Sequence, residues 1–321
     1  MLAIACPGQG SQTPGFLSPW LDLPGVRDHL EELGEQAGLD LVAHGTVSDE
    51  ETIKDTAVAQ PLIVAAGLLT ARLLLADHPV TAGTVVVGHS VGELTASAVA
   101  GALPEDDAVA LVRARANALA PAAAVTPTGM SAVLGGAPPE VIARLTERGL
   151  TPANANGGGR VVAAGTLEQL TALADDPPAK ARVIPLKVAG AFHTGHMAEA
   201  VTVLEQLRPS LRPAAPLATL LSNFDGRPVT TGEGNLDSLI AQVSRPVRWD
   251  LCMESLQSMG VTGMLELAPA GTLTGLAKRG MRGTATLAVK SPEDVEAARS
   301  FIEEHSRTPA LDPSLTPEGP Q

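Results

Sequence analysis

Apolar positions along this chain fall into two kinds of run, and the two kinds alternate. Short, nearly unbroken apolar runs predict strands buried on both faces, and longer mixed runs of apolar and polar residues predict helices. The first half is expected to contain a strand at 2–6, a short apolar strand at 85–87, an Ala-rich helix after the turn 88–92, and further helices within 17–38 and at 60–75 and 105–120. After residue 190 we expect helices at 194–207, 236–242, 251–258, 273–279 and 292–305, and strands at 217–222, 264–267 and 286–289. This alternation is typical of an α/β fold with a parallel sheet.

The middle of the chain follows a different pattern. After a change in composition at 121–129, the order over 130–188 is strand, helix, strand, strand, helix, strand, which is typical of a ferredoxin-like unit. We therefore expect a catalytic core formed by 1–125 and 190–305, interrupted by a subdomain at 126–189. The segment 306–321 is rich in proline, shows no periodicity and is expected to be a disordered tail.

Composition and charge narrow the functional classes. Apolar residues make up 45% of the chain but aromatic residues only 2%, so Ala, Val and Leu must build the core. A net charge of −13 argues against nucleic acids and anionic membranes as main partners. The apolar segment 61–76 contains Arg72 and is shorter than the ~20 residues of a spanning helix. Two cysteines and an N-terminus without a basic region favour a protein of the reducing cytoplasm.

The sequence Gly88-His-Ser-Val-Gly92 is the clearest chemical signal. It follows three valines and precedes an Ala-rich helix, which is the setting of a nucleophile elbow. Glycines on both sides of Ser90 are expected because the turn leaves no room for Cβ atoms. The helix N-terminus behind Ser90 favours the negative charge that develops on an attacked carbonyl. Ser90 is the predicted nucleophile.

A serine needs a base, and the chain contains seven histidines. His193 follows a predicted strand and a turn rich in Gly and Ala, so we favour it over His196. The loop 7–12 also follows a strand, but position 13 is Thr, so the dinucleotide motif GxGxxG is incomplete; no P-loop motif follows either. We expect this loop to bring backbone N–H groups to the site.

Seven segments together resemble the malonyl-CoA:acyl carrier protein transacylases in order and spacing. They are PGQGSQ (7–12), AQP (59–61), GHSVGE (88–93), Arg115 in its helix, GAFHT (190–194), PVRWDL (246–251) and GTLTGLAKR (271–279). The resemblance runs from Met1 to about His305. It implies an α/β-hydrolase-like core with a ferredoxin-like insertion.

The resemblance also implies roles for the reacting groups. Ser90 would carry the acyl group, and His193 would act as its base and acid. The backbone N–H groups of Gln9 and Val91 would form the oxyanion hole. Arg115 would bind the free malonyl carboxylate with its planar guanidinium, although Arg113 is an equal candidate apart from its spacing.

Further residues are expected around the substrate. Gln60 would lie near the site, Phe192 would fill the space that an α-methyl branch needs, and Asn154 would help to shape the pocket or form a turn. The backbone carbonyl of Arg248 would orient His193. The chain departs from many relatives at Ala116, where they have Gly, and at Arg248, where they have Gln.

The resemblance implies malonyl-CoA and a phosphopantetheinylated acyl carrier protein as partners, and no metal or redox cofactor. A basic patch would have to attract an acidic carrier, and its candidates are Lys278, Arg279 and Arg282. A discrete acyltransferase of a polyketide assembly line stays open as an alternative. A GxSxG thioesterase or lipase and a noncatalytic carrier-binding module are two further alternatives.

Overall fold

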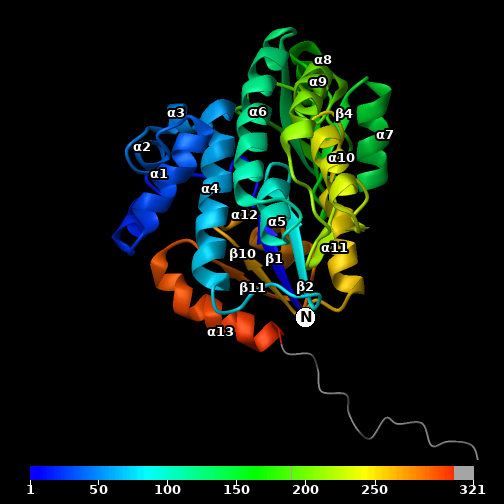
Figure 1. The fold of residues 1–321 in the computed structure, drawn as a ribbon. Helices are drawn as coiled ribbons and strands as arrows, with labels where there is room; N and C mark the ends of the chain where they lie inside the picture. The colour runs from blue at the N-terminus through cyan, green and yellow to red at the C-terminus, as the bar shows by residue number, and fades with distance from the viewer. Residues whose placement is uncertain (189, 307–321) are drawn as a thin grey trace, which may run out of the picture.

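Two β-sheets organise the chain in the computed structural model, which describes residues 1–188 and 190–306 (Figure 1). The larger sheet has six strands in the order β11-β10-β1-β2-β7-β8. All neighbouring strands are parallel except the β7–β8 pair. The bounds are β1 (Leu2–Cys6), β2 (Thr84–Gly88), β7 (Thr219–Leu221), β8 (Pro228–Val229), β10 (Gly263–Glu266) and β11 (Ala285–Ala288). The predicted α/β class with a mainly parallel sheet is confirmed.

Helices cover both faces of this sheet because its strands are apolar on both sides. In β1, Leu2, Ile4 and Cys6 join one hydrophobic core, and the alternating Ala3 and Ala5 join another. The first core is completed by α1 (Val26–Ala37), α4 (Thr56–Leu75), α5 (Gly92–Val99), α6 (Glu105–Ala124), α9 (Ala198–Leu207), α10 (Gly232–Gln242) and α13 (Val295–Ser306). The second is completed by α11 (Trp249–Ser258) and α12 (Thr272–Gly280). In Figure 1, α1 and the short α2 (Leu41–Thr46) and α3 (Glu50–Lys54) lie beyond α4.

Two helices begin at aspartates that the sequence analysis did not single out. The side chain of Asp49 caps α3 by accepting from the Thr52 backbone N–H at 2.9 Å. Asp55 caps α4, which therefore begins at Thr56 and not near Pro61. An aspartate oxygen satisfies a free N–H of the first turn, and that sets the start of the helix more firmly than a proline does.

The apolar segment expected to be too short for a membrane is longer than predicted. Helix α4 has 20 residues, and a window within it has a mean hydropathy of 1.8, so its length and composition would allow it to cross a membrane. Of this window, 78% is buried inside the protein. Packing of α4 against α5 and α6 in the core explains its apolar character.

The smaller sheet has five strands in the order β6-β3-β5-β4-β9. Its first four strands alternate with two helices in the predicted order: β3 (Thr128–Gly135), α7 (Pro138–Glu147), β4 (Thr151–Ala155), β5 (Arg160–Thr166), α8 (Leu167–Asp175) and β6 (Ala181–Pro185). The fifth, β9 (Val247–Arg248), comes from the C-terminal half and pairs parallel with β4. The sequence analysis did not foresee this strand. The expected tail, 306–321, lies outside the described residues apart from Ser306, the last residue of α13.

The carboxyl ends of β1 and β2 meet where the two predicted loops begin. Cys6 lies opposite Gly88 in the sheet register, so the loop after β1 and the elbow after β2 are neighbours. A Cβ atom at Gly92 would lie 2.2 Å from the carbonyl oxygen of Cys6, and one at Gly8 would lie 2.5 Å from that of His89. The expectation that this turn leaves no room for Cβ atoms is confirmed.

We expect Gly92→Ala to destabilise the fold by about 1–3 kcal/mol, because the added methyl group meets a rigid strand carbonyl. Gly83→Ala is the matched control, since its Cβ would meet only the Thr81 hydroxyl at 3.7 Å. Urea unfolding of both variants measures the difference. Equal stability of the two variants would contradict the close packing at the elbow.

Candidate active site

Ser90 occupies the elbow between β2 and α5 in a strained conformation. Its φ is 55°, so the left-handed geometry falls on the serine itself and not on the flanking glycines. The Asn223 side chain holds both sides of the turn. Its Oδ1 accepts from the Ser90 backbone N–H at 2.8 Å, and its Nδ2 donates to the Gly88 carbonyl at 2.7 Å. These two bonds fix the direction in which the hydroxyl points.

His193 lies next to the serine hydroxyl, as predicted. Its Nε2 is 2.8 Å from Ser90 Oγ, and its Nδ1 is 2.9 Å from the backbone carbonyl oxygen of Gln242. A carbonyl only accepts, so Nδ1 carries the proton and Nε2 accepts from the serine. The alternative candidate, His196, is exposed at the surface. The structure thus brings together the predicted nucleophile and the predicted base.

The predicted role of Arg248 is wrong, because the carbonyl that orients His193 belongs to Gln242. Gln242 is the last residue of α10, where carbonyls have no partner within the helix and are free to accept. Arg248 lies in β9, and its N–H donates to the Asn223 carbonyl at 2.8 Å. Its guanidinium pairs with Asp250 at 2.9 Å. The hydrogen bond from its backbone N–H and the ion pair with Asp250 thus fix the position of Arg248.

The electrostatic surroundings keep His193 neutral. Burial lowers the pKa of His193 to about 3, and the positive charge of Arg115 acts in the same direction. The hydrogen bond from Nδ1 to the Gln242 carbonyl opposes this shift but is outweighed. A neutral imidazole with a free Nε2 lone pair is the form that can remove the serine proton.

Arg115 brings a buried cation to the same place. Its side chain comes from α6, and the residue is only 3% exposed. Nη1 donates to Gln60 Oε1 at 2.5 Å, while Nη2 donates to Gln242 Oε1 at 3.1 Å and approaches Ser90 Oγ at 3.4 Å. Burial lowers the pKa of Arg115 to about 10, so it stays charged at neutral pH. The competing candidate, Arg113, is exposed and bonds to the Gln36 carbonyl.

Two glutamines connect the first loop to this cation. Gln60 Nε2 donates to Gln9 Oε1 at 3.2 Å, and Gln9 Nε2 donates to Thr56 Oγ1 at 3.2 Å. Among residues 1–188 and 190–306, the backbone N–H groups of Gln9 and Val91 have no hydrogen-bond acceptor. Both loops therefore offer donors next to the nucleophile.

One cavity of about 640 Å³ collects these groups. The predicted site residues that line it are Gln9, Gln60, Ser90, Arg115, Asn154, Phe192 and His193. Three further cations on its wall are Lys54, Arg160 and Lys187. The proposed docking residues Lys278, Arg279 and Arg282 are exposed near the end of α12, whose first turns also line the cavity. Within the described ranges, no group of three or more potential metal ligands occurs.

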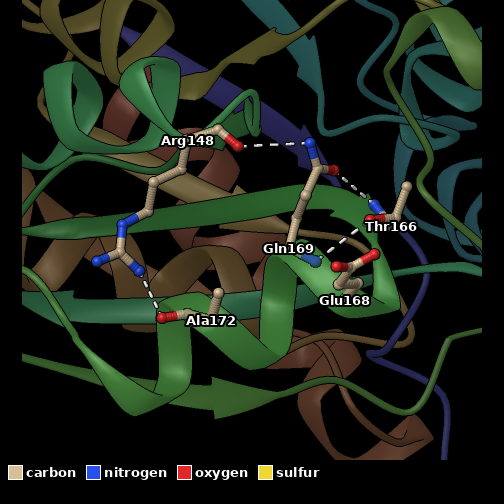
Figure 2. Close-up of a pocket in the computed structure, with 5 residues that line it drawn as sticks. All are labelled: Arg148, Thr166, Glu168, Gln169 and Ala172. Carbon is tan, nitrogen blue, oxygen red and sulfur yellow. Dashed lines mark hydrogen bonds between the residues drawn. The ribbon is translucent and has the colours of Figure 1, made fainter.

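A second cavity of about 530 Å³ lies by α8, against the smaller sheet, and has no comparable chemistry (Figure 2). Its polar side chains bond to the local backbone. Gln169 and Thr166 cap α8, and Arg148 donates to the Ala172 carbonyl (Figure 2). These bonds secure the helix, and the remaining polar lining residue is Glu168. No histidine or cysteine is among the five residues that line this cavity.

Three contributors to the site were missed or not interpreted by sequence reasoning. Gln242 and Asn223 lie outside the quoted segments, at a helix end and in a loop that the fold brings to Ser90. Glu93 stands inside the quoted segment GHSVGE, but the sequence alone shows no partner for it. The one available signal was its position three residues after Ser90, on the predicted Ala-rich helix.

The sequence of this chain is similar to known proteins over most of its length. Residues 4–307 match the family model described as acyl transferase domain. The chain is 53% identical over 298 residues to the malonyl CoA-acyl carrier protein transacylase of Mycobacterium tuberculosis (strain ATCC 25618 / H37Rv), covering 92% of this chain and 98% of that protein. The Bacillus subtilis (strain 168) protein of the same name is 31% identical over 317 residues, covering 95% and 98%.

Solved structures agree with these sequence relatives. The crystal structure of MCAT from Mycobacterium tuberculosis superposes with a TM-score of 0.88 at 51% identity, covering 93% of this chain and 99% of that one. A malonyl-transacylase in complex with a type II PKS acyl-carrier protein gives a TM-score of 0.87 at 27% identity, covering 93% and 99%.

The lowered pKa of His193 has a measurable consequence. We expect the rate of Ser90 acylation by an acyl thioester to stay high as the pH falls through 6.5, where an exposed histidine would already be protonated. A rate that falls with a midpoint near pH 6.5 would contradict the buried, neutral base.

The same shift predicts how stability depends on pH. His193 binds a proton at a higher pH in the unfolded chain than in the folded chain. Its favourable contribution to the free energy of unfolding is therefore complete above pH 6.5 and declines as the pH falls toward 3. In His193→Gln, the loss of unfolding free energy between about pH 7 and pH 5 should be smaller than in the wild type. Urea unfolding at the two pH values measures the difference.

Proposed function

Because this chain belongs to the acyl transferase family, we propose that it transfers malonyl groups from malonyl-CoA to the phosphopantetheine thiol of an acyl carrier protein. The observation that carries the proposal is the meeting of a nucleophile, a neutral base and a buried guanidinium in one cavity. The relatives named malonyl CoA-acyl carrier protein transacylase support the choice of acyl group and acceptor.

In the first half-reaction, Ser90 Oγ attacks the thioester carbonyl while His193 Nε2 takes its proton. The negative charge on the carbonyl oxygen would be stabilised by the backbone N–H group of Gln9, in the loop after β1, and by that of Val91, at the start of α5. The C–S bond then breaks, and the histidinium returns the proton to the leaving thiolate of coenzyme A. The product is malonyl-Ser90.

The second half-reaction repeats these steps with the carrier thiol as nucleophile. His193 takes the thiol proton, the thiolate attacks malonyl-Ser90, and the Ser90 oxygen leaves with the proton. Such a ping-pong cycle uses one site for both substrates in turn. It needs no resident metal or redox cofactor, because the base and the N–H donors supply the acid–base and electrostatic work.

Recognition of the acyl group falls to the cavity wall. Arg115 would bind the free malonyl carboxylate in a bidentate pair. Phe192, which lines the cavity, would disfavour an α-methyl branch by its bulk, and Asn154 would help to shape the pocket. Lys54, Arg160 and Lys187 have the charge that the phosphates of coenzyme A require.

The finer organisation of the chain is part of the same proposal. The larger sheet with 1–125 and 190–305 would form an α/β-hydrolase-like core, and 126–189 a ferredoxin-like subdomain. Antiparallel pairing in the order β6-β3-β5-β4 supports the second assignment. We also propose a cytoplasmic enzyme that meets its carrier in trans near Lys278, Arg279 and Arg282.

A second candidate is a discrete acyltransferase of a polyketide assembly line. The similarity to a malonyl-transacylase solved in complex with a type II PKS acyl-carrier protein supports this candidate. Both candidates share the same chemistry and differ only in the carrier. A hydrolase of neutral acyl groups is disfavoured, because it has no use for a buried guanidinium beside the serine.

Malonyl-CoA should leave a malonyl adduct on the peptide that contains Ser90, and addition of a phosphopantetheinylated carrier should remove it. Mass spectrometry of the intact protein and its peptides measures both steps. Ser90→Ala should show neither. An adduct on Ser11 or Cys6 in place of Ser90 would overturn the assignment.

Arg115→Ala should lower malonyl transfer strongly while acetyl transfer stays level or rises. A site built around a buried polar partner can discriminate by ~10⁴-fold against a substrate that lacks it, so the wild type should penalise acetyl-CoA. Arg113→Ala, two residues earlier on the same helix and exposed, is the matched control. Competition assays with malonyl-CoA and acetyl-CoA decide the matter, and an unchanged malonyl preference in Arg115→Ala would contradict the role.

A further inference from the structure

A buried carboxylate, Glu93, lies behind the reacting groups, and the mechanism above gives it no role. The residue is 4% exposed and stands in the first turn of α5. Its Oε1 accepts from the Asn223 backbone N–H at 2.6 Å, and its Oε2 accepts from Gln242 Nε2. Burying a carboxylate is costly unless such donors surround it, so a function is expected for it.

The amide of Gln242 lies between groups that can bond in only one way. Its Nε2 donates to Glu93 and also to the Ser90 carbonyl, 3.1 Å away. Its Oε1 accepts from Arg115 Nη2 at 3.1 Å. A carboxylate and a carbonyl only accept, and a guanidinium only donates. The amide therefore has one orientation that satisfies all three partners, and the Glu93 oxygen that accepts from Nε2 helps to enforce it. Burial raises the pKa of Glu93 to about 8, and the hydrogen bonds from Asn223 and Gln242 oppose this shift.

We propose that Glu93 is a positioning residue for malonyl recognition, which acts by holding the Gln242 amide oxygen toward Arg115 and so fixing the direction of the guanidinium. This inference rests on the proposed function. It assigns to Glu93 an effect on which acyl group is accepted, separate from the attack by Ser90 and His193. The His193 contact is to the backbone carbonyl of Gln242, so the side-chain orientation can change without removing it.

Replacing Glu93 by Gln keeps the size but not the bonding pattern. The new amide must face either the Asn223 N–H or Gln242 Nε2 with its own NH₂ group, and both of these are donors. Rotation of the Gln242 amide relieves the conflict, but then Nε2 faces Arg115, and the guanidinium loses an acceptor. Arg115 must shift to find another partner.

A purely electrostatic role would have the opposite effect. Glu93 has the same sign of charge as the malonyl carboxylate, and removing that charge would by itself favour malonyl binding. Losing the guanidinium direction would disfavour it. The ratio of malonyl to acetyl transfer therefore changes in opposite directions under the two explanations.

The test compares Glu93→Gln with the wild type in acylation of Ser90 by malonyl-CoA and by acetyl-CoA. We expect kcat/KM for malonyl-CoA to fall by about tenfold to a hundredfold, as for a misplaced substrate-orienting group. Acetyl-CoA should change by less than about threefold. An equal fall for both substrates would indicate a merely structural role, and an unchanged or higher malonyl preference would exclude positioning; either result overturns the proposal.

Two further variants complete the design. Ser97→Ala changes another buried polar side chain of α5, which bonds to Asn235 and to the Glu93 backbone carbonyl but not to the Glu93 side chain, and should leave the ratio unchanged. Gln242→Ala removes the amide but keeps the carbonyl that His193 needs. It should lower the ratio as Glu93→Gln does, and the double variant should be no worse than Gln242→Ala alone. Additive losses in the double variant would show that Glu93 does not act through Gln242.

Gln242→Ala also tests the link if Glu93→Gln does not fold, because an unchanged ratio in that variant overturns the proposal. Failure of the proposed function gives a different result, namely a wild-type protein that takes no malonyl group from malonyl-CoA.

Discussion

The constraint on which this site depends is a guanidinium withdrawn from water. Arg115 is 3% exposed, so bulk solvent compensates little for its charge. Oxygens of Gln60 and Gln242 accept its donors, and the Glu93 side chain accepts from the other end of the Gln242 amide. The same cation contributes to keeping His193 neutral. In the proposed mechanism, binding and catalysis therefore share one electrostatic source.

The reacting residues are also held by backbone geometry. Ser90 and His193 both have positive φ, at 55° and 62°, a conformation that non-glycine residues adopt only when their surroundings enforce it. Asn223 fixes the serine through its side chain, and Val243 fixes the histidine by accepting its backbone N–H at 3.1 Å. The segments that hold the two reacting side chains thus come from the C-terminal half, while the nucleophile comes from the N-terminal half.

Local sequence was sufficient where one short segment determines its own structure. The valine run and the paired glycines predict β2 and the turn, since Gly92 has no room for a Cβ atom. The resemblance to the transacylase family predicted that Arg115 and His193 lie near the serine. Sequence was insufficient where the fold joins distant segments. Gln242 contributes a helix-end carbonyl, and its position depends on where α10 ends. The resemblance assigned this role to Arg248 instead, because a short motif does not show which backbone carbonyl reaches His193. The start of α4 depended on the Asp55 cap, and β9 is only two residues long, too short for any periodic pattern.

The short strand β9 limits how the smaller sheet can be cut out of the chain or exchanged between relatives. Val247 and Arg248 occupy the outer side of β4, so a fragment ending at residue 189 would expose the backbone N–H and C=O groups of β4 as an open edge. Open edges of this kind favour pairing with other chains. A chimaera that exchanges this sheet between relatives must therefore carry two separate pieces of chain, the continuous segment and a dipeptide more than fifty residues downstream.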